Sequence, residues 1–66
     1  MNVRVNGERR ELDGGTSVAD VVRALTDAER GVAVAVDGEV VPRSAWSETA
    51  LADGQHVEVL RAVQGG

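Results

Sequence analysis

The stretch MNVRVNGERREL, residues 1–12, decides the fold, because it reads as two β-strands joined by a tight turn. Apolar and polar residues alternate from Met1 to Val5, which is the pattern of a strand with one buried face. Asn6-Gly7 is the strongest short hairpin signal, since a type I′ turn needs positive φ at both central positions. Asp13-Gly14-Gly15 supplies turn residues after the returning strand. We therefore predict an N-terminal β-hairpin.

A helix is predicted next, and its first turn carries a capping box. Ser17 and Asp20 have the spacing at which two side chains satisfy each other's backbone N–H groups. Apolar residues then recur at i, i+3, i+4 and i+7, which gives the helix one apolar face. Gly31 is the predicted terminator, after Arg30. Valines are mediocre helix formers, so packing must hold this helix.

The second half of the chain reads as another hairpin and a last strand. We predict a strand at 32–36, an Asp37-Gly38 turn and a strand at 39–41, which Pro42 either ends or places at an edge of the sheet. Residues 44–51 have no clear period and are predicted to form a loop with a short helical turn. The last predicted strand, 55–61, follows an Asp53-Gly54 turn.

This order predicts an α+β domain in which a mixed sheet packs on one helix. We assign residues 1–61 to the domain and 62–66 to a flexible tail. The predicted core is Val3, Val5, Val18, Val21, Val22, Leu25, Val34, Val36, Val57 and Val59, with Leu12, Val41, Leu51 and a plugging Trp46 as further candidates.

Composition and charge exclude several classes of protein. The chain has 66 residues, no cysteine and one histidine, so neither a disulfide nor a metal is expected to brace it. A net charge of −4, with no basic cluster beyond Arg9-Arg10, argues against nucleic-acid binding. The longest apolar run, Val32–Val36, is far shorter than the roughly 20 residues that span a bilayer. With no signal peptide visible, we expect a cytoplasmic protein that binds no membrane.

Patterns that carry enzyme chemistry are incomplete. His56 has no second histidine or cysteine for a metal site. The sequence around Ser17 partly matches the serine nucleophile elbow but lacks its second glycine. The Gly14-Gly15 pair has no P-loop lysine after it. All seven basic residues are arginine, so Met1 carries the chain's one amine. We expect a protein without catalytic residues, bound cofactor or metal.

The end of the chain, Val63-Gln64-Gly65-Gly66, is its most informative stretch. Glycines lack Cβ atoms, so such a tail can thread a narrow channel, and the six residues from Arg61 to Gly66 reach at most about 20 Å. A carboxylate is an anion at neutral pH and a poor electrophile, so a partner must first convert it to an acyl adenylate with ATP. If a persulfide then attacks, the product is a thiocarboxylate. We predict that Gly66 reacts while Val63, Gln64 and Gly65 thread the partner's active site.

Strand alternation also predicts a docking surface. If the valines of strands 32–36 and 55–61 face the helix, then Ala33, Ala35, Glu58 and Leu60 share the opposite face. The alanines keep this face flat, and Leu60 is an exposed apolar anchor beside the tail.

The whole chain resembles the ThiS family, the sulfur carriers of thiamine biosynthesis, which have the ubiquitin-like β-grasp fold. The resemblance lies in a set of short pieces in this order: Asn6-Gly7, Ser17–Val22, Val40-Val41-Pro42-Arg43 followed by Trp46, Leu51–Gly54 and Val63–Gly66. Gln55 departs from the pattern, because an acidic residue is common there.

The resemblance implies a set of partners. An adenylating enzyme of the ubiquitin-activating type would use ATP and Mg to activate Gly66. A persulfide donor, either a cysteine desulfurase or a rhodanese-like protein, would supply the sulfur, and thiazole synthase would receive it. The chain itself would be a co-substrate.

Other interpretations share the Gly-Gly end. The small subunit of molybdopterin synthase tends to be longer and to have a proline-rich approach to the tail, whereas residues 60–63 contain no proline. A carrier for another sulfur pathway, such as cysteine synthesis, has the same chemistry. A protein modifier that forms isopeptide bonds and an interaction module with an inert tail are the alternatives from other classes.

Overall fold

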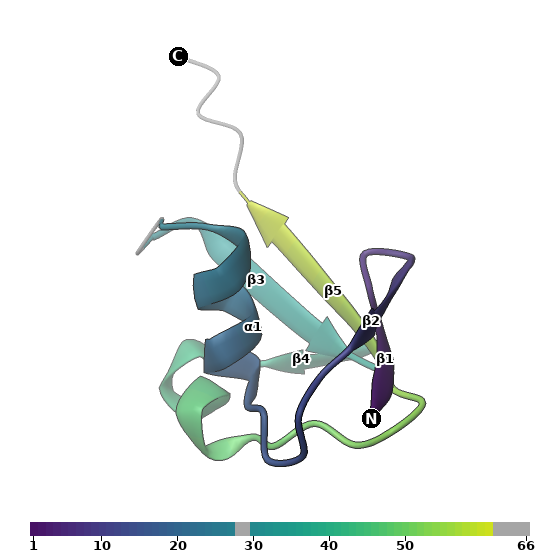
Figure 1. Ribbon diagram of the computed structural model, residues 1–66. Helices are drawn as coiled ribbons and strands as arrows, with labels where there is room; N and C mark the ends of the chain where they lie inside the picture. The colour runs from purple at the N-terminus through teal and green to yellow at the C-terminus, as the bar shows by residue number, and fades with distance from the viewer. Residues whose placement is uncertain (28–29, 62–66) are drawn as a thin grey trace.

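The computed structural model describes residues 1–27 and 30–61, which form a five-stranded sheet with a helix lying across one face (Figure 1). The elements are β1 (Asn2–Val5), β2 (Glu8–Glu11), α1 (Val18–Leu25), β3 (Val32–Val36), β4 (Glu39–Val41), the 3₁₀ helix η1 (Arg43–Glu48) and β5 (His56–Arg61). The predicted α+β fold and the β-grasp arrangement of a mixed sheet on one helix are confirmed. No helix in the described ranges is long and apolar enough to cross a membrane.

The last strand occupies the middle of the sheet. The strand order is β2-β1-β5-β3-β4, so β5 lies between the first strands of the two hairpins. It runs parallel to β1 and antiparallel to β3, while each hairpin is antiparallel within itself. Residues from both ends of the chain must therefore meet before the sheet is complete.

Both hairpins turn through a pair of residues in the left-handed region. Asn6 and Gly7 have φ of 51° and 84°, and Asp37 and Gly38 have φ of 49° and 84°. These values are the ones a type I′ turn requires, and its twist matches the twist of the flanking strands. The two predicted turns are confirmed.

The first residue of each turn also holds the central strand. The Asn6 side chain accepts a hydrogen bond from the Val59 N–H (2.8 Å) and donates one to the Val59 carbonyl (3.2 Å). The Asp37 carboxylate accepts from the His56 N–H at 2.9 Å. Asn6 thereby pairs with the backbone of β5 beyond the end of β1, and Asp37 pairs with it near the other end. Two turn side chains thus help to position the strand that leads to the tail.

Replacing Asn6 tests this role directly. We expect Asn6→Ala to lower the free energy of unfolding by about 3 kcal/mol, because two hydrogen bonds are lost and a residue with a Cβ must keep positive φ. Asn6→Gly loses the same hydrogen bonds but tolerates the φ, so we expect a loss of about 2 kcal/mol. Urea denaturation of both variants measures the difference. Two variants as stable as the wild type would contradict this role.

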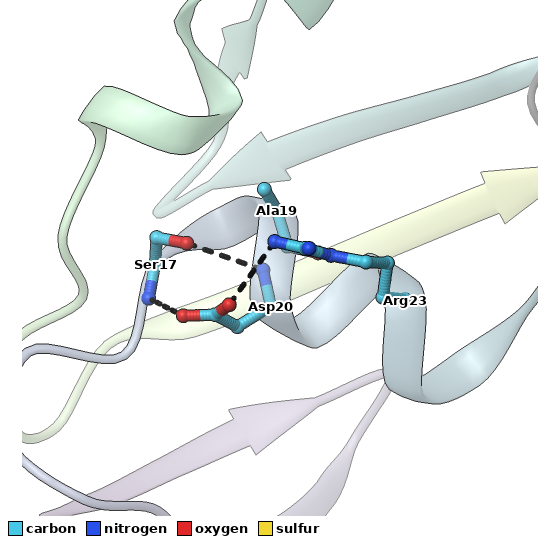
Figure 2. A network of polar contacts seen from close by, with 4 residues as sticks. All are labelled: Ser17, Ala19, Asp20 and Arg23. Atoms are coloured by element: carbon cyan, nitrogen blue, oxygen red, sulfur yellow. Dashed lines mark hydrogen bonds and ion pairs between the residues drawn. The ribbon is translucent and has the colours of Figure 1, made fainter.

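The capping box that opens α1 is confirmed in full (Figure 2). The Ser17 hydroxyl accepts from the Asp20 N–H at 3.2 Å, and the Asp20 carboxylate accepts from the Ser17 N–H at 3.0 Å. Arg23 donates to the same carboxylate at 3.2 Å and to the Ala19 carbonyl at 3.4 Å. The hydrogen bond from the Ser17 backbone, followed by that with its hydroxyl and by the Arg23 charge, lowers the pKa of Asp20. Ser17 is thus engaged as a helix cap.

The helix ends earlier than predicted. It stops at Leu25, where Thr26 has extended backbone and its N–H donates to the Val22 carbonyl at 2.9 Å. Leu25 is the last residue of the apolar face, and polar residues follow it, so further turns would bury nothing on the sheet. Gly31 has a φ of 71° and lies in the connection to β3, so its prediction as the helix terminator is wrong.

The buried core is the predicted one, except that Leu51 belongs to it and Leu25 does not. Leu25 is half-buried at the end of α1, whereas Leu51 is buried. Leu51 lies where the chain passes beside the helix start, with its N–H donating to the Thr16 carbonyl at 2.9 Å. Trp46 is half-buried at the margin of the core, and its indole N–H donates to the Val41 carbonyl at 2.9 Å. The buried residues are Val3, Val5, Val18, Val21, Val22, Val34, Val36, Leu51, Val57 and Val59.

Candidate functional site

The candidate site begins where β5 ends, at Arg61. Several elements hold this end: β3 pairs Val32 with Arg61, and the Arg61 guanidinium donates to the Thr26 hydroxyl at 3.5 Å. The Asn6 side chain holds β5 two residues earlier, at Val59. The fold therefore positions the start of the tail from three sides. Val63, Gln64, Gly65 and Gly66 lie outside the described residues, so their roles and the predicted flexibility stay predictions.

The four residues of the predicted docking surface share one face of the sheet. Ala33 lies directly opposite Leu60, and Ala35 lies opposite Glu58, in the antiparallel pairing of β3 with β5. The residues that alternate with them include the buried core valines Val34, Val36, Val57 and Val59. Leu60 is 64% exposed, so its side chain is open to contact from outside the domain. We call this side of the sheet the open face.

Val40 extends the apolar part of the open face and was missed in the sequence. It lies opposite Ala35 in the β3–β4 hairpin and is 77% exposed. The signal was present, because a two-residue turn at Asp37-Gly38 sets which residues face each other across the hairpin. Together with the three apolar residues of the predicted docking surface, it forms what we call the apolar patch: Ala33, Ala35, Val40 and Leu60.

The residues considered as catalytic candidates in the sequence lie on the sheet surface, at the helix cap and in a turn. His56 is exposed on β5 and Ser17 caps α1. Gly15 has a φ of 90° in the loop before the helix, which is a turn geometry that favours glycine. Within residues 1–27 and 30–61, no group of three or more histidine, aspartate and glutamate side chains is arranged to hold a metal ion. The functional features of the described residues are thus the open face of the sheet and the end of β5 at Arg61, where the tail begins.

Comparisons with known proteins agree with this geometry. The sequence profile of the ThiS family matches residues 3–66. The sulfur carrier protein ThiS of Escherichia coli is 24% identical over 66 residues, which is the full length of both chains. A crystal structure of the thiamine biosynthesis protein ThiS from Geobacter metallireducens is 38% identical, covers all of both chains and superposes with a TM-score of 0.77. A solution structure of a thiamine biosynthesis protein from the same organism, of which 88% is covered, gives 0.78.

A second kind of relative is larger. The thiazole synthase of Paramagnetospirillum magneticum is 32% identical to this chain over 66 residues, which is all of this chain and 20% of that enzyme. One polypeptide named thiazole synthase thus includes a stretch similar to the full length of this chain. With the family profile matched across nearly its full length, and with the fold of the solved ThiS structures, this chain belongs to the ThiS family.

Proposed function

We propose that this chain is a sulfur carrier of thiamine biosynthesis whose Gly66 carboxylate is adenylated and then converted to a thiocarboxylate. The observation that carries the proposal is the family match, which extends through residue 66. The fold supports it, because the central strand of the sheet leads to the tail and is held near its end by β3, by Thr26 after α1 and by the Asn6 turn.

The chemistry explains why a carrier needs partners. The Gly66 carboxylate attacks the α-phosphorus of ATP, pyrophosphate leaves, and the acyl adenylate becomes a good electrophile. The terminal sulfur of a persulfide attacks its carbonyl carbon and releases AMP, and reductive cleavage of the S–S bond by a thiol leaves the thiocarboxylate. ATP and Mg belong to the adenylating enzyme in this scheme. The chain acts as a co-substrate that needs no catalytic residue of its own.

Thiazole synthase is the proposed acceptor of the sulfur. The relative from Paramagnetospirillum magneticum supports this pairing, because a segment similar to this chain shares a polypeptide with that enzyme. The adenylating enzyme of the ubiquitin-activating type and the persulfide donor, a cysteine desulfurase or a rhodanese-like protein, are the further partners that we propose.

The mass of the protein isolated from its own cells tests the function. A carrier yields a species heavier than the encoded chain by the difference between one sulfur and one oxygen atom. Conjugates joined to other proteins through Gly66 would instead identify a modifier. An unmodified mass, together with no ATP–pyrophosphate exchange by the adenylating enzyme, would identify an interaction module with an inert tail.

We further propose that the apolar patch docks the adenylating enzyme, and Leu60→Glu tests it. We expect the kcat/KM of adenylation to fall about tenfold or more, since a buried apolar contact at an interface is replaced by a charge. The melting temperature should not change, because Leu60 is exposed. Ala24→Glu adds the same charge on the exposed side of α1 and is the matched control. Unchanged adenylation kinetics in Leu60→Glu would rule out docking through Leu60.

A further inference from the structure

The open face carries a second feature, at the opposite end of β5 from the tail. Arg9 of β2 lies directly opposite Arg4 of β1, and Arg4 lies beside His56 of β5. The three side chains line one open pocket of about 260 Å³. We call Arg4 and Arg9 the cationic row, with His56 beside it. The sequence predicted no basic cluster beyond Arg9-Arg10, but those two neighbours lie on opposite faces of their strand, and the fold gathers a different set.

The cationic row forms no direct ion pair within the described part of the chain. Like charges directly opposite each other on paired strands destabilise a sheet. Arg10 and Arg23 form ion pairs with Glu8 and Asp20, whereas Arg4 and Arg9 form none with any residue in 1–27 or 30–61. Glu11 and Glu58, which flank the row on the same face, are not paired with it either. In a chain with a net charge of −4, these two guanidinium groups can meet an external anion.

The donors around the pocket favour carboxylates on a protein surface. The Asn2 N–H donates to Asp53, the Arg4 N–H to the Gln55 carbonyl, and the Gly54 N–H to the Asn2 carbonyl. These N–H groups are therefore not available to cradle a phosphate, as a nest of backbone amides does. What remains are the guanidinium forks of Arg4 and Arg9 beside an open pocket, and such forks bind carboxylates in pairs of hydrogen bonds.

We propose that the cationic row is an electrostatic docking site for a cluster of aspartate and glutamate side chains on the adenylating partner. This inference rests on the proposed function, which requires that partner. His56 lies four residues before Leu60 on β5, or about 13 Å along an extended strand. A partner that contacts the row and the apolar patch together is held at two points, which orients it relative to the tail.

Neutralising the arginines of the row tests the inference. In Arg4→Gln/Arg9→Gln we expect the association rate constant with the adenylating enzyme, measured by stopped flow at low salt, to fall about tenfold. The difference from the wild type should disappear near 1 M salt, where the screening length is about 3 Å. In Arg4→Glu/Arg9→Glu the association rate should rise with salt instead of falling.

The matched control removes the same number of positive charges at positions that lie outside the open face. Arg10→Gln/Arg43→Gln has the same net charge, but Arg10 lies on the other side of β2 and Arg43 lies on η1 over the Trp46 ring. We expect this control to lose less than half of the wild-type rate. Equal rates in the two Gln pairs at every salt concentration would overturn the inference while leaving the carrier function intact. A wild-type chain that neither binds the enzyme nor supports pyrophosphate exchange would overturn the proposed function instead.

Discussion

Deletion of Gly66 is expected to abolish adenylation and to leave the stability of the domain unchanged. The deletion moves the terminal carboxylate back by one extended residue, about 3.3–3.6 Å. Reacting atoms must lie about 3–3.5 Å apart, and a misplacement of 1 Å can cost about a hundredfold in rate. Within residues 1–27 and 30–61, the buried core lies between Val3 and Val59, and a glycine has no side chain to bury, so we expect the deletion to leave the core intact.

ATP–pyrophosphate exchange with the adenylating enzyme, together with a melting curve, measures both parts of this result. Gly66→Ala is the matched control, because it keeps the carboxylate at the end of a chain of the same length. We expect the control to retain far more exchange activity than the deletion. Full exchange activity in the deletion variant would mean that the chemistry is not at Gly66, and the carrier function would then be wrong.

Gly65→Val is expected to lower the kcat/KM of the exchange reaction about a hundredfold. An enzyme that forms an acyl adenylate must keep water from the activated carbon, and a narrow channel around the tail does so. A β-branched side chain next to the reacting residue widens the tail where bare backbone would fit, and a displacement of about 1 Å is enough for a loss of this size.

Gly14→Val is the control for the Gly65 variant. A Cβ at Gly14 meets no atom within 4 Å, so the same substitution fits there without a clash. We expect the Gly14 variant to fold and to be adenylated like the wild type. If Gly65→Val has a normal kcat/KM, the tail does not pass through a narrow channel.

Much of the candidate site could be predicted from local sequence patterns. Alternation in the strands placed Leu60, Glu58, Ala33 and Ala35 on one face, and the register of β3 with β5 confirms it. The tail was identified from its residues alone, and the family profile extends over it. Val40 could have been added from the Asp37-Gly38 turn. The pairing of Arg4 with Arg9 could likewise have been derived from the Asn6-Gly7 turn. The position of His56 beside Arg4 could not, because it depends on which strands are neighbours in the sheet.

The sequence by itself determined the elements whose signals are local. Asn6-Gly7 and Asp37-Gly38 set two turns through backbone φ, and the Ser17–Asp20 spacing set the start of the helix through its own hydrogen bonds. Each of these depends on atoms a few residues apart, so short patterns contain the whole interaction.

The tertiary structure decided what depends on distant residues. It placed β5 beside β1, which brought His56 next to Arg4, and it buried Leu51 beside the helix start in place of Leu25. It also ended α1 at Leu25, where Thr26 adopts extended backbone and its N–H donates to the Val22 carbonyl. The free energy of such contacts comes from apolar burial and strand pairing between elements that are far apart in the sequence. The residue pattern of one element therefore does not reveal which other element will lie against it.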